Sequence, residues 1–314
     1  MLTAYDENGK FINLLCKKVK KQKFTCPACK SELILKSGSI KIPHFAHRSL
    51  KDCQSWSENE SFQHLSLKKS IYQMLINTEK VELEKYLEKL EQTPDILIND
   101  CIAIEIQCSR LSIKRLFERT RNYQKHGYKV LWLLGKDLWI KNKLSPLQYH
   151  FLYFSKNRGF YCWELDLKRQ KIRLKYLIHQ NLRGEIAYLI EEFSFQSLDF
   201  LEIMRRPFQA QRSESLSLKK DKFLSHFIQQ ELYYCKPKWM EIQEIYYKKG
   251  KNLLDEDFPV HWFPLGLDLF SSETEQFCQI SEELSQYYRK FLNYHEKNPY
   301  EKVFSPAFYD KIKE

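Results

Sequence analysis

The hydrophobic pattern of the first 57 residues predicts short strands joined by turns. Asn8-Gly9 separates two apolar runs in LTAYDENGKFINLL, a typical signal of a β-hairpin. The segments FTCPACKSELILKSG and SIKIPHFAH continue in the same style. We therefore predict a small β-rich module over residues 1–57.

A helix is predicted next. Ser57-Glu58-Asn59-Glu60 fits the S-x-x-E capping box, so the helix is expected to begin there and to reach about Asn77. The following segment VELEKYLEKL fits two structures. Val81 and Leu83 alternate as in a strand, whereas Leu83, Leu87 and Leu90 have helical spacing.

The stretch TPDILINDCIAIEIQCS predicts two strands around Asn99-Asp100 and carries acidic residues that β-strands disfavour. Side chains alternate across a strand, so Glu105 and Gln107 share one face. Asp95 joins that face only if the antiparallel register pairs it with Glu105, which requires an odd loop centred on Asp100. A two-residue Asn-Asp turn would place the carboxylates on opposite faces, so we predict the odd loop.

The next segments predict a mixed sheet with helices packed on it. Ser109 opens a predicted helix that ends near His126, before Gly127, and YKVLWLLG reads as a buried strand. GFYCWELDL and KIRLKYLI predict a hairpin around Lys168-Arg169. We assign residues 58–180 to this α/β domain.

Beyond about residue 180 the pattern becomes helical. The predicted helical segments are IAYLIEEFSFQSLDFLEIM, LKKDKFLSHFIQQELYYC and ETEQFCQISEELSQYYRKFL. Their aromatic and aliphatic residues recur every three or four residues, which is typical of helices that pack in a core. We therefore predict a mainly helical C-terminal domain over residues 181–314.

Composition favours a cytoplasmic protein with a polyanionic partner. No apolar run is long enough to span a membrane, the start lacks a signal-peptide core, and the nine cysteines are an odd number. The net charge is +11, and residues 1–57 supply most of it, with 11 Lys/Arg against 4 Asp/Glu. A basic surface favours nucleic acid, although a generally lysine-rich composition would give the same excess.

The N-terminal module contains a cluster of zinc-type ligands. Cys26-Pro-Ala-Cys29 is followed by His44-Phe-Ala-His47 and then by Cys53. Zinc takes four sulfur or nitrogen ligands, and such an ion helps a small module to fold. We predict a structural zinc site made from four of these five residues, with Cys53 and His44 competing for the last place. A redox CxxC pair is the alternative.

The carboxylates predict a second, catalytic metal. Asp95 and Glu105 on one face repel each other unless a cation lies between them, and such oxygen ligands suit Mg²⁺ or Mn²⁺. Gln107 is positioned to orient a water molecule. On the preceding helix Glu60, His64 and Lys68 share a face, so Glu60 is a candidate for the metal and the other two for phosphate. A solvated helix face, with Glu60 serving only the capping box, is the competing reading.

These motifs resemble a known family. P94-D95…E105-I106-Q107 resembles the PD-(D/E)XK nuclease motif with Gln in place of Lys, and CPAC…PHFAH and ESFQHLSLK extend the resemblance to the competence protein CoiA family. The matched segments cover roughly residues 24–135. The resemblance implies a zinc-finger-like module, a restriction-endonuclease-like core and a helical C-terminal domain, and it makes residues 80–87 a strand.

The resemblance also implies roles for individual residues. Asp95 and Glu105 would be metal ligands, Gln107 would fill the lysine position, and Glu60 would be the acid of the first helix. Since an amide carries no charge, the missing cation would come from another side chain, for which Lys68, Lys114 and Arg110 are the candidates. RTRNYQ, with Arg119 and Tyr123, resembles the Q-x-x-x-Y element of exonuclease-like members with Arg in place of Gln, and packing is an equal reading of Tyr123.

Three functions follow as hypotheses. The first is a Mg²⁺- or Mn²⁺-dependent deoxyribonuclease that processes single-stranded or branched DNA during natural transformation. The second is a non-catalytic DNA-binding accessory protein that retains the nuclease fold. The third is a scaffold whose C-terminal domain recruits recombination proteins. Intact Asp95, Glu105 and Gln107 favour the first, because buried carboxylates without a partner are costly.

Overall fold

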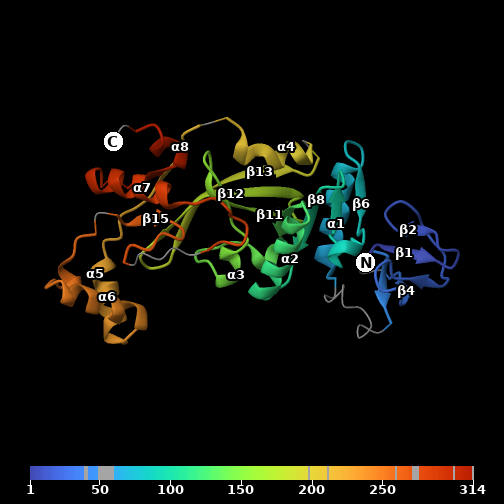
Figure 1. Ribbon diagram of the computed structural model, residues 1–314, viewed down its shortest axis with the longest axis horizontal. Coiled ribbons are helices and arrows are strands. Elements are labelled where there is room, and N and C mark those ends of the chain that lie inside the picture. The colour runs from blue at the N-terminus through green and yellow to red at the C-terminus, as the bar shows by residue number, and fades with distance from the viewer. Residues whose placement is uncertain are drawn as a thin grey trace. The chain divides into compact units, whose positions relative to one another are not determined.

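The computed structural model of the protein describes residues 1–38, 42–48, 60–196, 199–210, 212–258, 260–270, 276–299 and 301–312. Figure 1 labels its helices and strands. The contacts within the chain form two compact units, each described by itself below. The first comprises Met1–Trp139, Trp163–Leu174 and Glu191–Arg206, and the second comprises Ile140–Cys162, Lys175–Ile190 and Pro207–Glu314. The predicted domain limit at residue 57 lies outside the described residues, and the limit at 180 stays a prediction.

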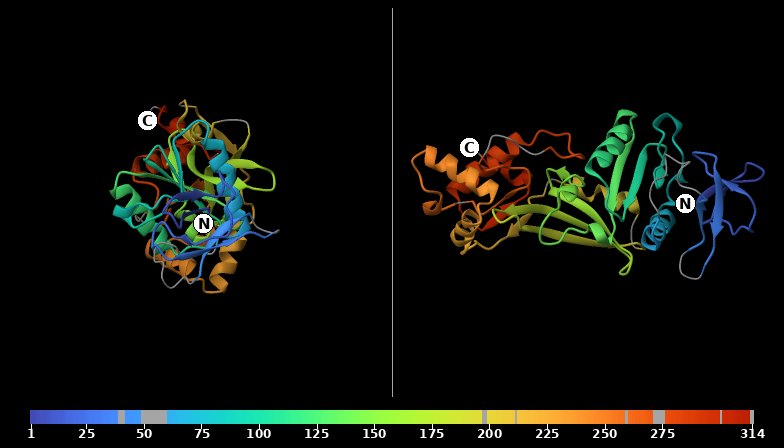
Figure 2. Two further views of the ribbon diagram at one scale, coloured as in Figure 1. Left: turned by 90° about the vertical axis from the view of Figure 1, so that its right-hand side faces the viewer. Right: turned by 90° about the horizontal axis from the view of Figure 1, so that it is seen from below.

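A small antiparallel sheet begins the first unit, in the order β2-β1-β3-β4-β5. Its strands, blue in Figure 2, are β1 (Thr3–Asp6), β2 (Phe11–Asn13), β3 (Phe24–Thr25), β4 (Glu32–Lys36) and β5 (His44–His47). The predicted hairpin is confirmed, because Tyr5 pairs with Phe11 and Gly9 has a φ of 73°. The buried core of this sheet is small and includes Phe24, Leu33 and Phe45.

A larger, nine-stranded sheet has the order β13-β12-β11-β9-β8-β7-β6, with β10 on β11 and β15 on β12. Its strands are β6 (Val81–Leu83), β7 (Ile96–Ile98), β8 (Ile102–Gln107), β9 (Lys129–Leu134), β10 (Tyr153–Ser155), β11 (Gly159–Asp166), β12 (Lys171–Asn181), β13 (Ile186–Ser194) and β15 (Trp262–Pro264). Strand β9 is parallel to β8 and β11, whereas β6–β7 and β7–β8 are antiparallel. The predicted mixed sheet is therefore confirmed.

The odd loop between β7 and β8 is also confirmed. Ile96 pairs with Ile104 and Ile98 with Ile102, so a three-residue loop from Asn99 to Cys101 joins the strands. Asn99 and Asp100 both have positive φ, 49° and 56°, a conformation that Asn and Asp tolerate better than most residues. The register continues to place Asp95 opposite Glu105.

The strand expected at residues 80–87 exists but is shorter. Strand β6 pairs with β7 from Val81 to Leu83. Glu84 then takes a φ of 49°, which turns the chain out of the extended conformation. The helical alternative for the start of this segment is therefore wrong, although Glu88–Leu90 forms one 3-10 turn.

Two helices pack on the sheet in the first unit. Helix α1 (Phe62–Leu75) contacts β6 and β8, and α2 (Ile113–Lys125) contacts β9. The predicted start of α1 is wrong: Ser61 is its N-cap, and Glu60 lies before the helix. Ser57 lies outside the described residues. Both Ser61 and the N-cap of α2, Ser112, accept a hydrogen bond from the amide three residues on, which satisfies a free donor of the first turn.

Helix α2 begins at Ser112 rather than at Ser109, so the predicted start is three residues too early. Its end before Gly127 agrees with the prediction, since Gly127 has a φ of 81°.

The region after residue 180 mixes strands with helices. Residues 186–194, predicted as the beginning of a helix, form strand β13, and among the described residues of that segment the helix is confined to α4 (Phe200–Arg205). A turn at Asn181–Gly184, in which the Gly184 amide donates to the carbonyl of Asn181, returns the chain beside β12. Sheet pairing therefore overrides the helical spacing.

The remaining helices are α3 (Pro146–Tyr149), α5 (Leu224–Tyr233), α6 (Pro237–Lys248), α7 (Ser285–Lys297) and α8 (Pro306–Tyr309), and β14 (Ser215–Ser217) pairs with β16 (Lys302–Phe304). Within the described ranges, further 3-10 turns lie at Lys136–Leu138, Arg206–Phe208 and Leu253–Asp255. The aromatic stripe of α7 is core as predicted, with Tyr287, Tyr288 and Phe291 buried. Among the described residues, no helix combines the length and the apolar character needed to cross a bilayer.

Candidate functional site

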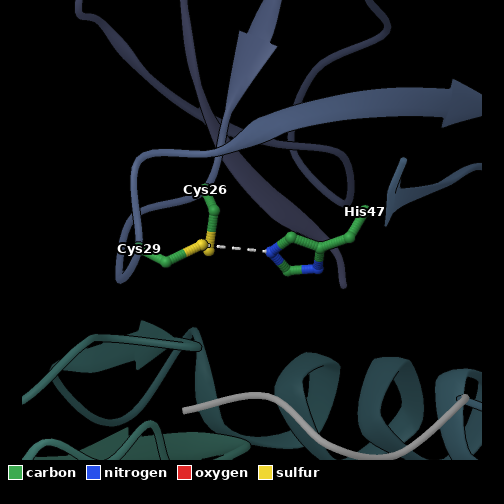
Figure 3. A group of neighbouring side chains, drawn as sticks. All are labelled: Cys26, Cys29 and His47. Carbon is green, nitrogen blue, oxygen red and sulfur yellow. Dashed lines mark hydrogen bonds between the residues drawn. The ribbon is translucent and has the colours of Figure 1, made fainter. Parts of the chain in front are cut away.

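Three of the five predicted zinc ligands meet at one end of the small sheet. Cys26 and Cys29 come from the turn between β3 and β4, and His47 ends β5 (Figure 3). Cys29 Sγ lies 3.4 Å from His47 Nε2, and one ligand atom from each of the three residues lies within 4.8 Å of the others. Lys30, with a φ of 61°, donates its amide to the Cys26 carbonyl and closes the turn that brings both sulfurs to the same side.

The other two candidates are not in this group. His44 is three residues before His47 on β5, and alternation along a strand puts the two side chains on opposite faces. The Nδ1 atom of His44 instead lies 2.9 Å from the carbonyl oxygen of Ile42. Cys53 lies outside the described residues. Burial raises the pKa of the Cys26 thiol to about 12, so a thiolate at this position requires a neighbouring cation.

A second group forms around Lys68 on α1. The Lys68 side chain is fully buried, and its ammonium lies 2.7 Å from Glu84 Oε1 and 2.8 Å from Asp95 Oδ1. It also contacts the carboxylate of Glu60. Burial works to lower the pKa of Lys68, but the carboxylates of Asp95, Glu60 and Glu84 outweigh burial and hold that pKa well above its usual range.

Asp95, just before β7, contacts a backbone amide and the side chains of His64 and Lys68. Its Oδ2 accepts the amide of Ile106 at 2.8 Å and lies 3.0 Å from His64 Nε2. Burial favours the protonated form, yet His64 and Lys68 outweigh it and hold the pKa of Asp95 well below its usual range. The same neighbours keep Asp95 ionised and fixed in position.

Glu60 and His64 complete the group. His64 Nδ1 lies 3.4 Å from Glu60 Oε1, and Glu60 also accepts from the amino group of Met1. Burial works to raise the pKa of Glu60, but Lys68 and the other neighbouring cations lower it to about 2. Glu60, His64 and Asp95 each offer a ligand atom within 4.8 Å of the others. The structure therefore brings Glu60, His64 and Lys68 together beside Asp95.

Glu105 does not belong to that close group. Its carboxylate accepts from the guanidinium of Arg119 and, at 2.7 Å, from the hydroxyl of Tyr123. Burial raises the pKa of Glu105 and the charge of Asp95 adds to it, against the lowering effect of Arg119. The Q-x-x-x-Y-like pair from α2 thus contacts the second acid of the motif, while a metal shared by Asp95 and Glu105 stays a prediction.

Gln107 follows Glu105 on the same strand and is buried. Its Nε2 donates to the carbonyl oxygen of Ser109 at 3.0 Å. Among the three cations considered as substitutes for the missing lysine, Lys68 alone contacts Asp95 among the described ion pairs. Lys114 is 86% exposed and lies 3.9 Å from Glu118, and Arg110 is exposed. The geometry therefore favours Lys68.

Glu84 is a site residue that the sequence did not single out. It is fully buried, and its Oε2 accepts from the amides of Leu2 and Thr3 and from the Thr3 hydroxyl, at 2.7, 3.0 and 2.9 Å. Its place at the end of VELE carries no signal beyond a short alternation, because the partners lie 81 and 82 residues away. Glu60, Glu84 and Asp95 thus surround the Lys68 ammonium, and the Met1 amino group is a second cation at Glu60.

Comparisons with known proteins agree with these motifs. The family description "Competence protein CoiA, nuclease-like domain" matches residues 60–207, and "Competence protein CoiA, N-terminal domain" matches residues 12–56. Competence protein CoiA of Bacillus subtilis (strain 168) is 30% identical over 171 residues, which are 51% of this chain and 45% of the relative. The matched part thus spans about half the length of that relative. No solved structure matches the chain.

Both domain matches contain the residues described above: the nuclease-like match includes Glu60, Asp95 and Glu105, and the N-terminal match includes Cys26 and His47. The nuclease-like match agrees with the fold expected of the central region. With the two matches side by side on one chain, the protein belongs to the competence protein CoiA family.

Proposed function

We propose that the protein is a Mg²⁺- or Mn²⁺-dependent deoxyribonuclease that acts on DNA taken up during natural transformation. The observation that carries the proposal is that Glu60, His64 and Asp95, of which the two acids are buried, bring ligand atoms within 4.8 Å of one another. With His64 neutral, the carboxylates of Glu60, Glu84 and Asp95 carry one more charge than Lys68 and the Met1 amino group together, and a divalent cation would offset that remaining negative charge. The role in competence is inferred from membership of the competence protein CoiA family.

Glu60, His64 and Asp95 would hold the ion, with Glu105 opposite Asp95 on the adjacent strand β8. When bound, such an ion lowers the pKa of a water and stabilises charge on a phosphodiester. The surrounding residues of the chain would keep these ligands in place. Lys68 contacts the carboxylates of Glu60 and Asp95, and the Ile106 amide donates to Asp95. His64 would have to be neutral at Nε2 to act as a ligand.

Gln107 would take the place of the usual lysine as a polar but uncharged group. Gln107 is buried two residues after Glu105 on β8, and its side-chain amide donates to the carbonyl oxygen of Ser109. We propose that Lys68 compensates for the charge by fixing the acids, and that Gln107 orients water or backbone near the reacting phosphate.

We further propose a structural zinc ion on Cys26, Cys29 and His47. The fit is supported by the soft donor set and by the approach of Cys29 to His47. A bound zinc would cross-link β5 to the turn after β3, which a sheet with so small a core needs. Cys53 is the candidate for the fourth ligand.

DNA is the proposed partner, in single-stranded or branched form, together with recombination proteins. The net charge of +11 supports a polyanion. We propose a cytoplasmic location, because the described cysteines are thiols, as is typical of a reducing compartment.

The alternative is a non-catalytic DNA-binding accessory protein with the same fold. Two observations favour it: Glu105 is neutralised by Arg119, and Gln107 stands where a lysine is usual. The two functions differ in whether the protein cleaves the DNA that it binds.

The decisive experiment incubates the purified chain with single-stranded, duplex and branched DNA in Mn²⁺. Asp95→Asn is expected to abolish cleavage. Glu82→Gln is the matched control, because Glu82 lies on the adjacent strand β6 and pairs with the partly exposed Lys85. Cleavage that survives Asp95→Asn would refute the site, and absence of cleavage on every substrate would leave the accessory role.

A further inference from the structure

A continuous chain of buried polar contacts runs from the first strand of the small sheet to the candidate metal ligands. Glu84 is its midpoint. One carboxylate oxygen, Oε2, accepts the amides of Leu2 and Thr3 and the Thr3 hydroxyl. The other, Oε1, lies 2.7 Å from the ammonium of Lys68. Both Glu84 and Lys68 are fully buried.

Each link in this chain depends on the one before it. A buried carboxylate is stable only when donors replace its lost hydration. Of the donors described above for Glu84, three come from Leu2 and Thr3 and one from Lys68. Loss of the three would leave a buried charge that draws more strongly on the Lys68 ammonium.

Lys68 links Glu84 to the proposed metal ligands. Its ammonium holds Asp95 through Oδ1 at 2.8 Å and also contacts Glu60. The other oxygen of Asp95 accepts the Ile106 amide. A shift of Lys68 toward Glu84 therefore loosens one side of Asp95 and changes the hydrogen bond on its other side.

We infer that Glu84 is a positioning residue through which the contact of Leu2 and Thr3 sets the placement of Lys68 and, through it, of Asp95. The small N-terminal sheet then helps to position the candidate metal ligands. The catalytic consequence rests on the proposed function, whereas the structural coupling does not.

The test uses Thr3→Val, which removes the hydroxyl donor at nearly constant volume, and Thr3→Ser as the matched variant that keeps it. The readout is hydrogen exchange of the Ile106 amide in the full chain, relative to the Leu131 amide on β9. We expect Thr3→Val to speed exchange at Ile106 about 10-fold relative to Leu131, and Thr3→Ser to match the parent. Glu84→Gln, which weakens the pull of Glu84 on Lys68, should have the opposite effect and slow exchange at Ile106 relative to Leu131.

A second readout is the affinity for Mn²⁺, measured by calorimetry. It should fall about 10-fold in Thr3→Val and stay unchanged in Thr3→Ser, since outer contacts of metal ligands typically have effects of this size. Where the parent cleaves DNA, kcat should fall with KM for DNA unchanged.

Unchanged Ile106 exchange in both Thr3→Val and Glu84→Gln would overturn the inference. Equal acceleration at Ile106 and Leu131 would also overturn it, because it would mean a general loss of stability. A parent that cleaves no DNA would remove the proposed function, but the exchange measurement would still decide whether Glu84 couples the two regions.

Discussion

Arg119, half-buried on helix α2, forms an ion pair with the buried Glu105 of strand β8, and Tyr123 donates to the same carboxylate. The pair leaves Glu105 neutralised in the absence of a metal. It also explains how the second acid of the motif can stay buried without a partner ion, which the spacing of the strands alone did not suggest.

Arg119→Gln should therefore destabilise the protein by about 3 kcal/mol in metal-free buffer, because it leaves a buried carboxylate unpaired. Tyr123→Phe should cost about 1 kcal/mol, the usual contribution of one hydrogen bond. Urea unfolding measures both. If Glu105 also takes part in metal binding, Mn²⁺ should restore much of the stability of Arg119→Gln; a variant as stable as the parent without metal would show that the pair has no structural weight.

His64→Gln should weaken Mn²⁺ binding by about 10- to 100-fold, since it removes one of the three converging ligand atoms. His126→Gln is the control, because His126 is exposed at the end of α2. Calorimetric titration measures the affinities. Equal affinity in the two variants would move the ion away from His64 and toward the pair Asp95 and Glu105.

Zinc content should distinguish the two histidines of HFAH. His47→Asn should lose the metal, because His47 faces Cys29, while His44→Asn should keep one equivalent, because His44 lies on the other face of β5. Elemental analysis of the purified variants gives the result directly. Loss of zinc in His44→Asn with retention in His47→Asn would reverse the assignment, and Cys53→Ser would show whether that residue is the fourth ligand.

Lys68→Met should destabilise the fold by about 3–5 kcal/mol, because it leaves three carboxylates around an uncharged side chain. Lys69→Met is the matched control on the same helix turn; Lys69 is partly exposed, so its change should stay within about 0.5 kcal/mol. Thermal or urea unfolding measures the difference. Similar stabilities of the two variants would mean that the buried lysine is not what holds the acids together.

Stability should fall in mild acid through two buried histidines of the second unit. Burial lowers the pKa of His179 and of His295 to about 4 in each case. The unfolded chain takes up these protons below about pH 6.5, whereas the folded protein does not, so the stability is fully present above that pH and is lost as the pH falls toward 4.

Each of these histidines should lower the free energy of unfolding by about 2 kcal/mol between pH 7.5 and pH 5. His295→Gln removes one such group and should show a flatter pH profile in urea unfolding. An identical profile for parent and variant would rule out His295 as a source of acid sensitivity.

The parts of the fold that sequence predicted well are those set by local chemistry. The Asn8-Gly9 hairpin and the odd loop at Asp100 follow from turn residues and from the two-residue period of strands. Strand β13 was mistaken for a helix because its aliphatic residues also fit helical spacing, and only pairing with β12 decides between the two.

The candidate site divides along the same line. Asp95, Glu105, and His64 and Lys68 on α1 with Glu60 just before it, could be found from spacing, because local structure places each of these side chains. The role of Glu84 could not be, since its donors come from Leu2 and Thr3 at the far end of the sequence. The pairing of Arg119 with Glu105 depends likewise on how α2 packs against the sheet.

The three-residue loop between β7 and β8 has a consequence for how this hairpin tolerates change in length. Two added residues would preserve which side chains share a face, whereas one added or deleted residue would turn Asp95 away from Glu105 along with every other residue of its strand. Length variation at this tip should therefore occur in steps of two, and a peptide tag placed there with an even number of residues should leave the acids where they are.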